Sequence, residues 1–187
     1  MKLFKVALET VIIVIGIVLF LKFFVLGFFY VSSDSMYPKL LEGDYIIVSK
    51  VSYDIFGFEY NQPSLGDIVV INKDGYKITK RLVGLPGDSI VYDSKNVFIN
   101  GLGLVFNQYQ KYSDFIENVP NNMITHHFLN EEKEEYFFIG DFLELSRDSR
   151  NFGAIDKDKI VGKAIVVYLS KDSNNKIRTQ RIGNLLK

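Results

Sequence analysis

The 187-residue chain contains no cysteine and only two histidines. Without cysteine the protein can form no disulfide bond, no thiolate nucleophile and no cysteine-based metal site. The histidines, His126 and His127, are adjacent in the sequence. A catalytic triad with histidine as its base could therefore take that base from only one place in the chain. No carboxylate lies at ligand spacing from this pair. We therefore predict no metal and no other cofactor.

The chain also lacks net charge, since 22 Lys and Arg residues balance 22 Asp and Glu residues. This balance argues against a nucleic-acid partner bound through bulk charge. The composition is 48% hydrophobic and 14% aromatic, which is enough to bury a core and is poor for a disordered chain. The length predicts one domain, with room for an appendage. The composition leaves the oligomeric state open.

An apolar run opens the chain. Residues 3–21 read LFKVALETVIIVIGIVLFL, and about 20 mostly apolar residues are needed to cross a bilayer. Lys2 and Lys5 flank the run at its start and Lys22 closes it, a pattern that favours a cytoplasmic N-terminus. We expect residues 1–22 to form a single-pass membrane anchor and residues 23–187 to form a catalytic β domain on the outer side.

Two other interpretations of this run are weaker. A cleaved signal peptide requires a small-residue cleavage site, and the following GFFYVSS offers no Ala-x-Ala pattern. A buried helix of a soluble domain would show a polar face, and none interrupts residues 11–21.

After the anchor the periodicity changes to that of strands. The segments are short, rich in β-branched and aromatic residues, and mostly bounded by Gly, Asp, Asn or Pro. They are residues 43–52, 66–73, 76–84, 88–94, 96–101, 136–141 and 162–170. Gly-Asp recurs at 43–44, 66–67, 87–88 and 140–141, where each pair suits a turn. The pattern predicts a mainly β fold, an antiparallel sandwich or barrel-like domain.

Two stretches depart from this pattern. Residues from about 103 to 135 are polar with scattered aromatics, which predicts an insertion or long loop with a solvated acidic run at 131–135. Residues 23–31, FFVLGFFYV, are too apolar for an exposed linker. We expect them to form a first strand that rests on the outer leaflet, as interfacial aromatic belts do.

A hydroxyl-rich turn, SSDSMYPKL at 32–40, follows directly on this apolar stretch. A lone serine in a turn is usually only a turn residue. A nucleophile held at a membrane surface would nevertheless stand there, and Ser35 is the candidate.

Lys80 is the candidate base. If residues 76–83 form a strand, Lys80 shares a face with Ile78 and Leu82, as a lysine that points into a core would. To act as a base near neutrality, Lys80 would need a pKa roughly 3 units below its usual value near 10.4. Burial can supply this shift, which corresponds to about 4 kcal/mol of destabilisation of the charged form. The neutral amine could then accept a proton from a nearby serine hydroxyl. The alternative is a lysine that extends from a strand edge into solvent.

Four segments carry a family resemblance. SSDSMYPKL, GDIVVI, TKRLVGLPGD and GDFLELSRDSRNFG, in this order behind an N-terminal apolar run, resemble the boxes of type I signal peptidases. These are membrane-anchored Ser–Lys endopeptidases of the bacterial envelope. The resemblance implies that Ser35 is the nucleophile and Lys80 the general base. It also implies that Ser33 contributes a hydroxyl to the oxyanion hole and that Ser146 orients the lysine amine.

The same boxes place four charged residues near the site, and we expect them to brace loops through ion pairs. They are Arg81, Asp141, Asp148 and Arg150. The chain departs from the family where Ser32 replaces a usual proline and where 142–145, Phe-Leu-Glu-Leu, replaces Asn-Arg-Asp-Asn. These departures bear on local bracing and on substrate range.

The resemblance implies cleavage of signal peptides from translocated preproteins, with small residues at positions −1 and −3 of the substrate. The substrate would add as a strand beside an exposed sheet edge. The enzyme would lie in the bacterial inner membrane, in contact with lipid, with its catalytic domain on the periplasmic or extracellular side. Two alternatives stay open: a specialised peptidase that matures components of a conjugation or secretion apparatus, and a non-catalytic anchored β-domain.

Overall fold

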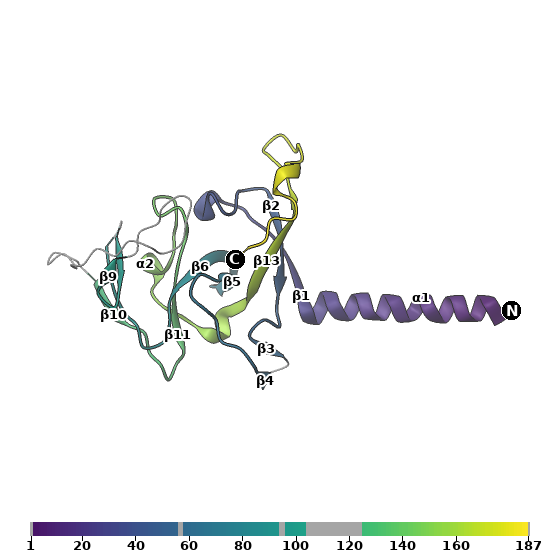
Figure 1. The fold of residues 1–187 in the computed structure, drawn as a ribbon, viewed down its shortest axis with the longest axis horizontal. Coiled ribbons are helices and arrows are strands. Elements are labelled where there is room, and N and C mark those ends of the chain that lie inside the picture. The colour runs from purple at the N-terminus through teal and green to yellow at the C-terminus, as the bar shows by residue number, and fades with distance from the viewer. Residues whose placement is uncertain (1, 56–57, 94–95, 104–124, 187) are drawn as a thin grey trace.

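The computed structural model describes residues 2–55, 58–93, 96–103 and 125–186. Its N-terminal helix α1 (Lys2–Phe20) continues without a break into a turn of π-helix, η1 (Leu21–Val25). The apolar helical segment Phe4–Val25 spans 22 residues, none of them buried, and projects from the rest of the molecule (Figure 1). At 1.5 Å per residue this is about 33 Å, enough to cross a bilayer.

The helix ends later than the sequence suggested. Residues 23–25 belong to it, and strand β1 (Leu26–Tyr30) begins at the next residue. The apolar character of Phe23 and Phe24 suits a lipid-exposed helix as well as a strand, which is why composition alone did not set this boundary.

Seven strands form the main sheet, in the spatial order β1-β2-β13-β5-β6-β11-β12. Its neighbouring strands are antiparallel. The other members after β1 are β2 (Asp44–Ser49), β5 (Ile68–Lys73), β6 (Tyr76–Gly84), β11 (Glu135–Ile139), β12 (Ile155–Asp156) and β13 (Ile160–Ser170). The predicted mainly β, antiparallel fold behind an apolar N-terminal helix is thus confirmed.

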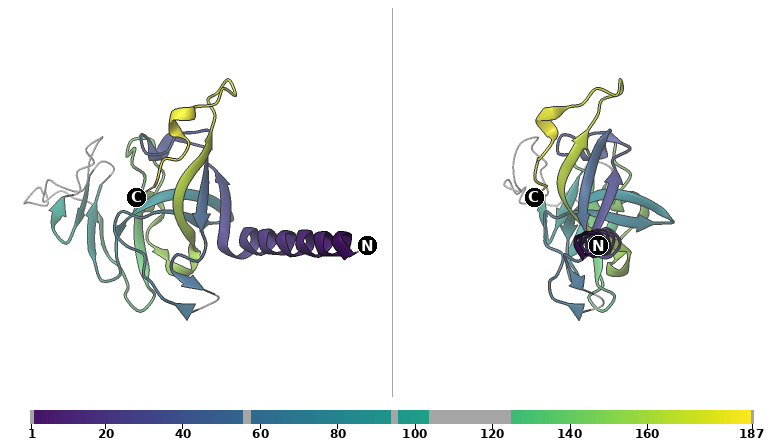
Figure 2. Two further views of the ribbon diagram at one scale, coloured as in Figure 1. Left: turned by 45° about the vertical axis from the view of Figure 1, so that its right-hand side comes forward. Right: turned by 90° about the vertical axis from the view of Figure 1, so that its right-hand side faces the viewer.

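A smaller sheet lies at the end of the domain opposite the helix (Figures 1 and 2). Its order is β10-β7-β8-β9, and a separate hairpin pairs β3 with β4. The strands are β7 (Ser89–Tyr92), β8 (Val97–Ile99), β9 (Leu102–Gly103), β10 (Thr125–Phe128), β3 (Asp54–Ile55) and β4 (Phe58–Glu59). The remaining helical turns are η2 (Asp34–Met36), α2 (Ser149–Phe152), η3 (Lys157–Lys159) and η4 (Thr179–Arg181).

The polar insertion is narrower than 103–135. Strand β10 lies inside that range and pairs with β7, and Leu129 just after it is only 3% exposed. Sequence patterning missed β10 because four residues with two histidines carry little strand signal. Residues 104–124, the rest of the expected insertion, lie outside the described residues.

Among the described residues the core forms three apolar clusters, and two of them position the site. One lies under the turn η2 and includes Val31, Met36 and Leu40 together with Ile46, Val48 and Leu186. The other contains Val69, Ile71 and Leu82, with Ile78 packed against it. Because β5 alternates sides, Val70 belongs to the first cluster while Val69 and Ile71 belong to the second. The centre of the main sheet is therefore packed on both faces.

Candidate active site

Ser35 stands in the middle of the 3-10 turn η2, which follows the end of β1. The Tyr37 backbone N–H closes the turn by donating to the Asp34 carbonyl at 2.9 Å. Met36, next in the chain, is 1% exposed and fixes the turn to the core, whereas Ser35 is 7% exposed. The serine hydroxyl is therefore held at the boundary between core and surface by its neighbour's burial.

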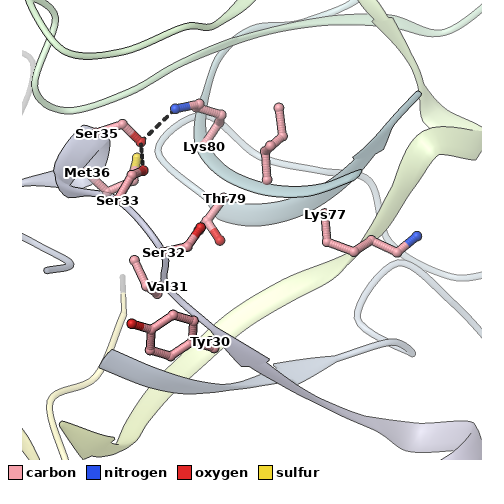
Figure 3. A pocket seen from close by; sticks show the side chains of 10 residues that line it. Tyr30, Val31, Ser32, Ser33, Ser35, Met36, Lys77, Thr79 and Lys80 are labelled. Atoms are coloured by element: carbon pink, nitrogen blue, oxygen red, sulfur yellow. Dashed lines mark hydrogen bonds between the residues drawn. The ribbon is translucent and has the colours of Figure 1, made fainter. Parts of the chain in front are cut away.

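Lys80 reaches this hydroxyl from the middle of β6. Its Nζ donates to the Ser35 Oγ at 2.7 Å (Figure 3) and to the Ser146 Oγ at 3.1 Å. Its strand partner across the ladder is Val69, and Lys80 is only 4% exposed. The alternation of β6 thus turns the lysine inward, on the face that the sequence pattern indicated.

Burial is the main influence on the charge of Lys80. Desolvation is the largest influence and lowers the pKa of the Lys80 amine to about 8. The Asp148 carboxylate raises this pKa, the Arg150 guanidinium lowers it, and the Asp141 carboxylate raises it. The ammonium form is disfavoured because the buried amine has lost most of its water. At mildly alkaline pH a large fraction of Lys80 is therefore neutral.

Two further serines complete a chain of hydroxyls around the amine. Ser33 Oγ donates to Ser35 Oγ at 3.3 Å, and Ser146, at 9% exposed, contacts Lys80 from the other side. All four residues singled out from the sequence as nucleophile, base, oxyanion donor and orienting hydroxyl lie together. They come from three separate segments of the chain.

Gly140 allows these segments to meet, and the sequence analysis treated it only as a turn residue. A Cβ at this position would lie 2.2 Å from Ser146 Oγ and 2.4 Å from the Ser35 carbonyl oxygen. The Phe142 backbone N–H donates to that same carbonyl at 3.0 Å. The end of β11 therefore backs directly onto the Ser35 turn, which only a residue without a side chain permits.

The first charged pair joins Arg81 to Asp141. The Arg81 Nε and NH2 groups each donate to one Asp141 oxygen at 2.6 Å, and NH1 donates to the Gly66 carbonyl at 2.7 Å. This fork links β6, which carries Lys80, to the loop after β11.

The second pair joins Asp148 to Arg150. Asp148 is fully buried, accepts from both Nε and NH2 of Arg150 at 2.9 Å, and accepts from the Gly140 N–H at 3.1 Å. Arg150 NH2 also donates to the Leu143 carbonyl at 2.8 Å. Each pair holds a loop beside Ser35 and Lys80.

The C-terminal segment makes contacts that the sequence analysis did not predict. Arg181 NH2 donates to the Asp44 carboxylate at 2.6 Å and to the Lys39 carbonyl at 2.9 Å. Leu186 is 2% exposed and belongs to the cluster under Met36. The tail thus holds the loop that follows Ser35.

A pocket opens beside Ser35. It is lined by Tyr30, Val31, Ser32, Ser33, Ser35 and Met36 on one side and by residues 77–80 of β6 on the other (Figure 3). Within the described part of the chain, β11 pairs with β6 only from Arg81 onward, so the edge of residues 76–80 opposite β5 has no strand partner. The pocket therefore runs along an open strand edge.

Possible metal ligands are sparse near this site. In the described ranges no three His, Cys, Asp or Glu side chains gather to form a metal cluster. His127 instead lies on β10 with its Nε2 3.5 Å from Glu135 Oε2.

Comparison with known proteins decides the family. The family model described as signal peptidase, peptidase S26, matches residues 4–169 of this chain. The chain belongs to the signal peptidase family. Its membership makes it a hydrolase that cleaves signal peptides from preproteins, and the apolar N-terminal helix is consistent with a membrane-anchored enzyme.

Two bacterial signal peptidases agree with this assignment. Signal peptidase IB of Staphylococcus aureus (strain COL) is 33% identical over 165 residues, covering 78% of this chain and 82% of that protein. Signal peptidase I of Buchnera aphidicola subsp. Schizaphis graminum is 28% identical, covering 90% of this chain and 78% of that protein. A solved signal peptidase I from Enterococcus faecalis V583 is 24% identical, covers 56% of this chain and 98% of that one, and has a TM-score of 0.36.

Proposed function

We propose that this signal peptidase cuts by a Ser–Lys dyad in which Ser35 is the nucleophile and Lys80 the general base. The observation that carries the proposal is the 2.7 Å contact between a buried amine and the hydroxyl of a surface turn. A lysine at such a distance with a lowered pKa has the reach and the basicity that proton abstraction requires.

The reaction has two stages. Ser35 Oγ attacks the scissile carbonyl carbon while Lys80 Nζ accepts the hydroxyl proton. The tetrahedral oxyanion is met by the Ser33 hydroxyl and the Ser35 backbone N–H, donors worth roughly 3 kcal/mol each. Lys80 then protonates the leaving amine, and an ester joins the signal peptide to Ser35. A water deprotonated by Lys80 hydrolyses the ester and restores the serine.

Ser146 serves as a positioning residue in this scheme. Its hydroxyl, 3.1 Å from the amine, orients the Lys80 lone pair toward Ser35. This is the third-group role that catalytic triads also require.

We propose that the substrate binds as an extended strand along residues 76–80 of β6. In a strand, side chains two residues apart point the same way, so positions −1 and −3 of the substrate enter the pocket together. Aromatic and aliphatic residues such as Tyr30, Val31 and Met36 line that pocket and restrict it to small side chains. The preference for small residues at −1 and −3 follows from this crowding.

We further propose that an aromatic surface on β1, β2 and β13 rests on lipid. Phe28 and Tyr168 rings meet edge to face at 5.7 Å, and Tyr45 lies 6.1 Å from Tyr168 and 5.1 Å from Tyr30. Phe28 is 47% and Tyr30 52% exposed, on a strand that begins where the apolar helix ends. Aromatic rings prefer the headgroup region of a bilayer.

This surface can be tested with a single fluorophore, because the chain has no tryptophan. In the full-length enzyme reconstituted in vesicles, brominated lipids should quench a Tyr168→Trp variant strongly. A Phe128→Trp variant, on β10 of the remote small sheet, should be quenched little. Equal quenching of the two would contradict the lipid contact.

The side of the membrane is also a proposal. Lys2 and Lys5 favour a cytoplasmic N-terminus, which places the catalytic domain on the outer side of the bacterial inner membrane. Single cysteines introduced at Lys2 and at Asn175 of this cysteine-free chain should differ in labelling. A membrane-impermeant maleimide should modify only the second in spheroplasts or cells without a wall.

The dyad is tested by cleavage of a preprotein with an Ala-x-Ala site. Ser35→Ala and Lys80→Met should each lower kcat/KM by at least about 10⁴-fold, as for members of other catalytic units, while both remain folded. For the wild type, kcat/KM should rise with pH and level off above about 8, the pKa of Lys80. Full activity in either folded variant would refute the dyad.

A comparison of substrates separates a general from a dedicated peptidase. A general enzyme processes unrelated preproteins with similar kcat/KM. An enzyme devoted to a secretion or conjugation component would cut that one substrate far faster than the rest.

A further inference from the structure

A second surface lies next to Ser35 and outside the pocket. The pocket is lined by residues that precede Tyr37 and by β6, and neither Tyr37 nor Phe142 lines it. The Tyr37 and Phe142 rings lie 6.0 Å apart and are tilted by 54°. Tyr37 is 47% exposed, and Leu145, three residues beyond Phe142, is 65% exposed. Apolar groups thus gather at the surface just beyond the nucleophile.

This surface is fixed relative to the nucleophile. Phe142 donates its backbone N–H to the Ser35 carbonyl at 3.0 Å, so its main chain is tied to the Ser35 turn. Asp141 is clamped by Arg81, and the Leu143 carbonyl by Arg150. Binding to a surface ordered in advance loses little conformational entropy.

The loop that carries Phe142 divides its apolar residues between core and surface. Leu143 packs against the cluster that includes Val83 and Phe137, so its burial explains its presence. Leu145 has no such role because most of its side chain faces solvent. Between them, Glu144 is exposed and would repel an acidic ligand.

A peptide that crosses Ser35 can pass over this surface. If the residues before the scissile bond lie in the pocket, those after it leave on the opposite side of the Ser35 Oγ. An extended chain advances about 3.3 Å per residue, so its first two residues span roughly the 6.0 Å that separates the two rings.

We propose that Tyr37, Phe142 and Leu145 form a subsite for an apolar side chain in the first two residues after the scissile bond. The occupant is the new N-terminus of the mature protein. This inference rests on the proposed roles of Ser35 and Lys80, since they define which part of the substrate lies beyond the nucleophile. It assigns a substrate preference to the segment in which this chain departs from its family.

The test uses two preproteins that are identical up to the cleavage site. One carries Leu-Leu and the other Asn-Asn directly after it, since the two side chains are similar in size. The full-length enzyme should cleave the first with a kcat/KM about 5- to 10-fold higher, as partial burial of an apolar side chain supplies. Phe142→Ser and Leu145→Ser should each reduce this ratio to below about 2-fold. Phe128→Ser, at an exposed aromatic on the remote β10, should leave it unchanged.

The stage of the reaction adds a second measurement. Both substrates leave the same acyl-enzyme, so the preference must appear in acylation and vanish in the rate of ester hydrolysis. Leu145 is mostly exposed, so its variant should fold even if Phe142→Ser does not.

Each failure has its own meaning. A wild-type ratio near one, or a ratio unchanged in Leu145→Ser, overturns the subsite. A loss that is equal for both substrates and seen only in vesicles would make the surface a lipid contact instead, and also overturns it. Full cleavage by Ser35→Ala would overturn the dyad itself, whatever the ratio.

Discussion

The four Gly-Asp pairs of this chain have the same sequence and two different structural roles. At three of them the glycine has a φ near +90° and the aspartate closes its own turn. The Asp44, Asp67 and Asp88 carboxylates accept from the backbone N–H three residues earlier, at 3.0, 3.1 and 2.7 Å. Their own backbone N–H groups donate back to the same residues, each at 3.0 Å. These are local turns that a glycine and an aspartate can form anywhere.

The fourth pair, Gly140-Asp141, makes no such turn. Position 140 requires glycine because Ser35 and Ser146 lie too close for a side chain. The Asp141 carboxylate binds Arg81. Two of these partners, Arg81 and Ser35, lie 60 or more residues away in the sequence, so no local pattern reveals them. The same dipeptide is therefore a turn where its contacts are local and a site component where they are tertiary.

The difference between the local Gly-Asp turns and the tertiary pair at 140–141 is tested most strongly by adding one methyl group at Gly140. Gly140→Ala places a carbon against the Ser35 carbonyl and Ser146 Oγ, which displaces Ser35 and Ser146 from their present positions around Lys80. We expect kcat/KM to fall by about 100-fold or more, since a 1 Å displacement of a reacting group has that effect. Preprotein cleavage by the folded variant measures it. Near wild-type activity would show that the Ser35 turn accommodates the methyl group.

Asp44 lies between the two roles, because it closes a turn and also binds Arg181 and Ser170. Arg181→Gln leaves a fully buried carboxylate without its cation and should lower the free energy of unfolding by about 2 kcal/mol. Urea unfolding measures the change. The double variant Asp44→Asn, Arg181→Gln should recover part of it, and no recovery would show that the ion pair is not the cause.

Removing the negative charge of Asp141 should shift the dependence of kcat/KM on pH. The Asp141 carboxylate raises the pKa of Lys80, so Asp141→Asn lowers that pKa further and leaves the amine neutral at lower pH. The rising limb of kcat/KM against pH should move to lower pH. The matched variant Asp88→Asn, in a local turn, should leave the limb in place. A limb that moves alike in both variants, or in neither, would contradict the assignment of Lys80 as the titrating base.

The lowered pKa of Lys80 should also make the free energy of unfolding depend on pH. The folded pKa of Lys80, about 8, lies below its unfolded value near 10.5, so the unfolded state binds more protons between these pH values. The free energy of unfolding should therefore contain a contribution from Lys80 that rises from about pH 8 to 10.5, by about 3 kcal/mol at most. Lys80→Met should abolish this rise in denaturant titrations. An unchanged rise would mean that another group titrates.

The smallest effect is expected at a turn pair. In Gly87→Ala the new carbon meets the end of the flexible Glu131 side chain, and the residue must keep a φ of +89°. We expect a loss of about 1 kcal/mol of stability and no change in kcat/KM. Thermal unfolding and the cleavage assay together check this. A large loss of activity would remove the distinction between local and tertiary pairs.

Local patterns predicted much of the fold. Each of the seven segments predicted as strands overlaps one, because alternation and bounding turn residues are properties of neighbours in the chain. The missed strands β3, β4, β9, β10 and β12 have two to four residues, too few to show a period. Their positions depend on pairing partners instead.

The sequence by itself determined the apolar helix, the strand-rich domain and the inward face of Lys80, since each follows from the order of polar and apolar residues along one segment. Only the tertiary structure decided that this amine meets Ser35, that Gly140 must lack a side chain, and that Arg181 and Leu186 hold the loop after Ser35. Those contacts join segments that are far apart along the chain. Their distances depend on strand register and packing, which no single segment encodes.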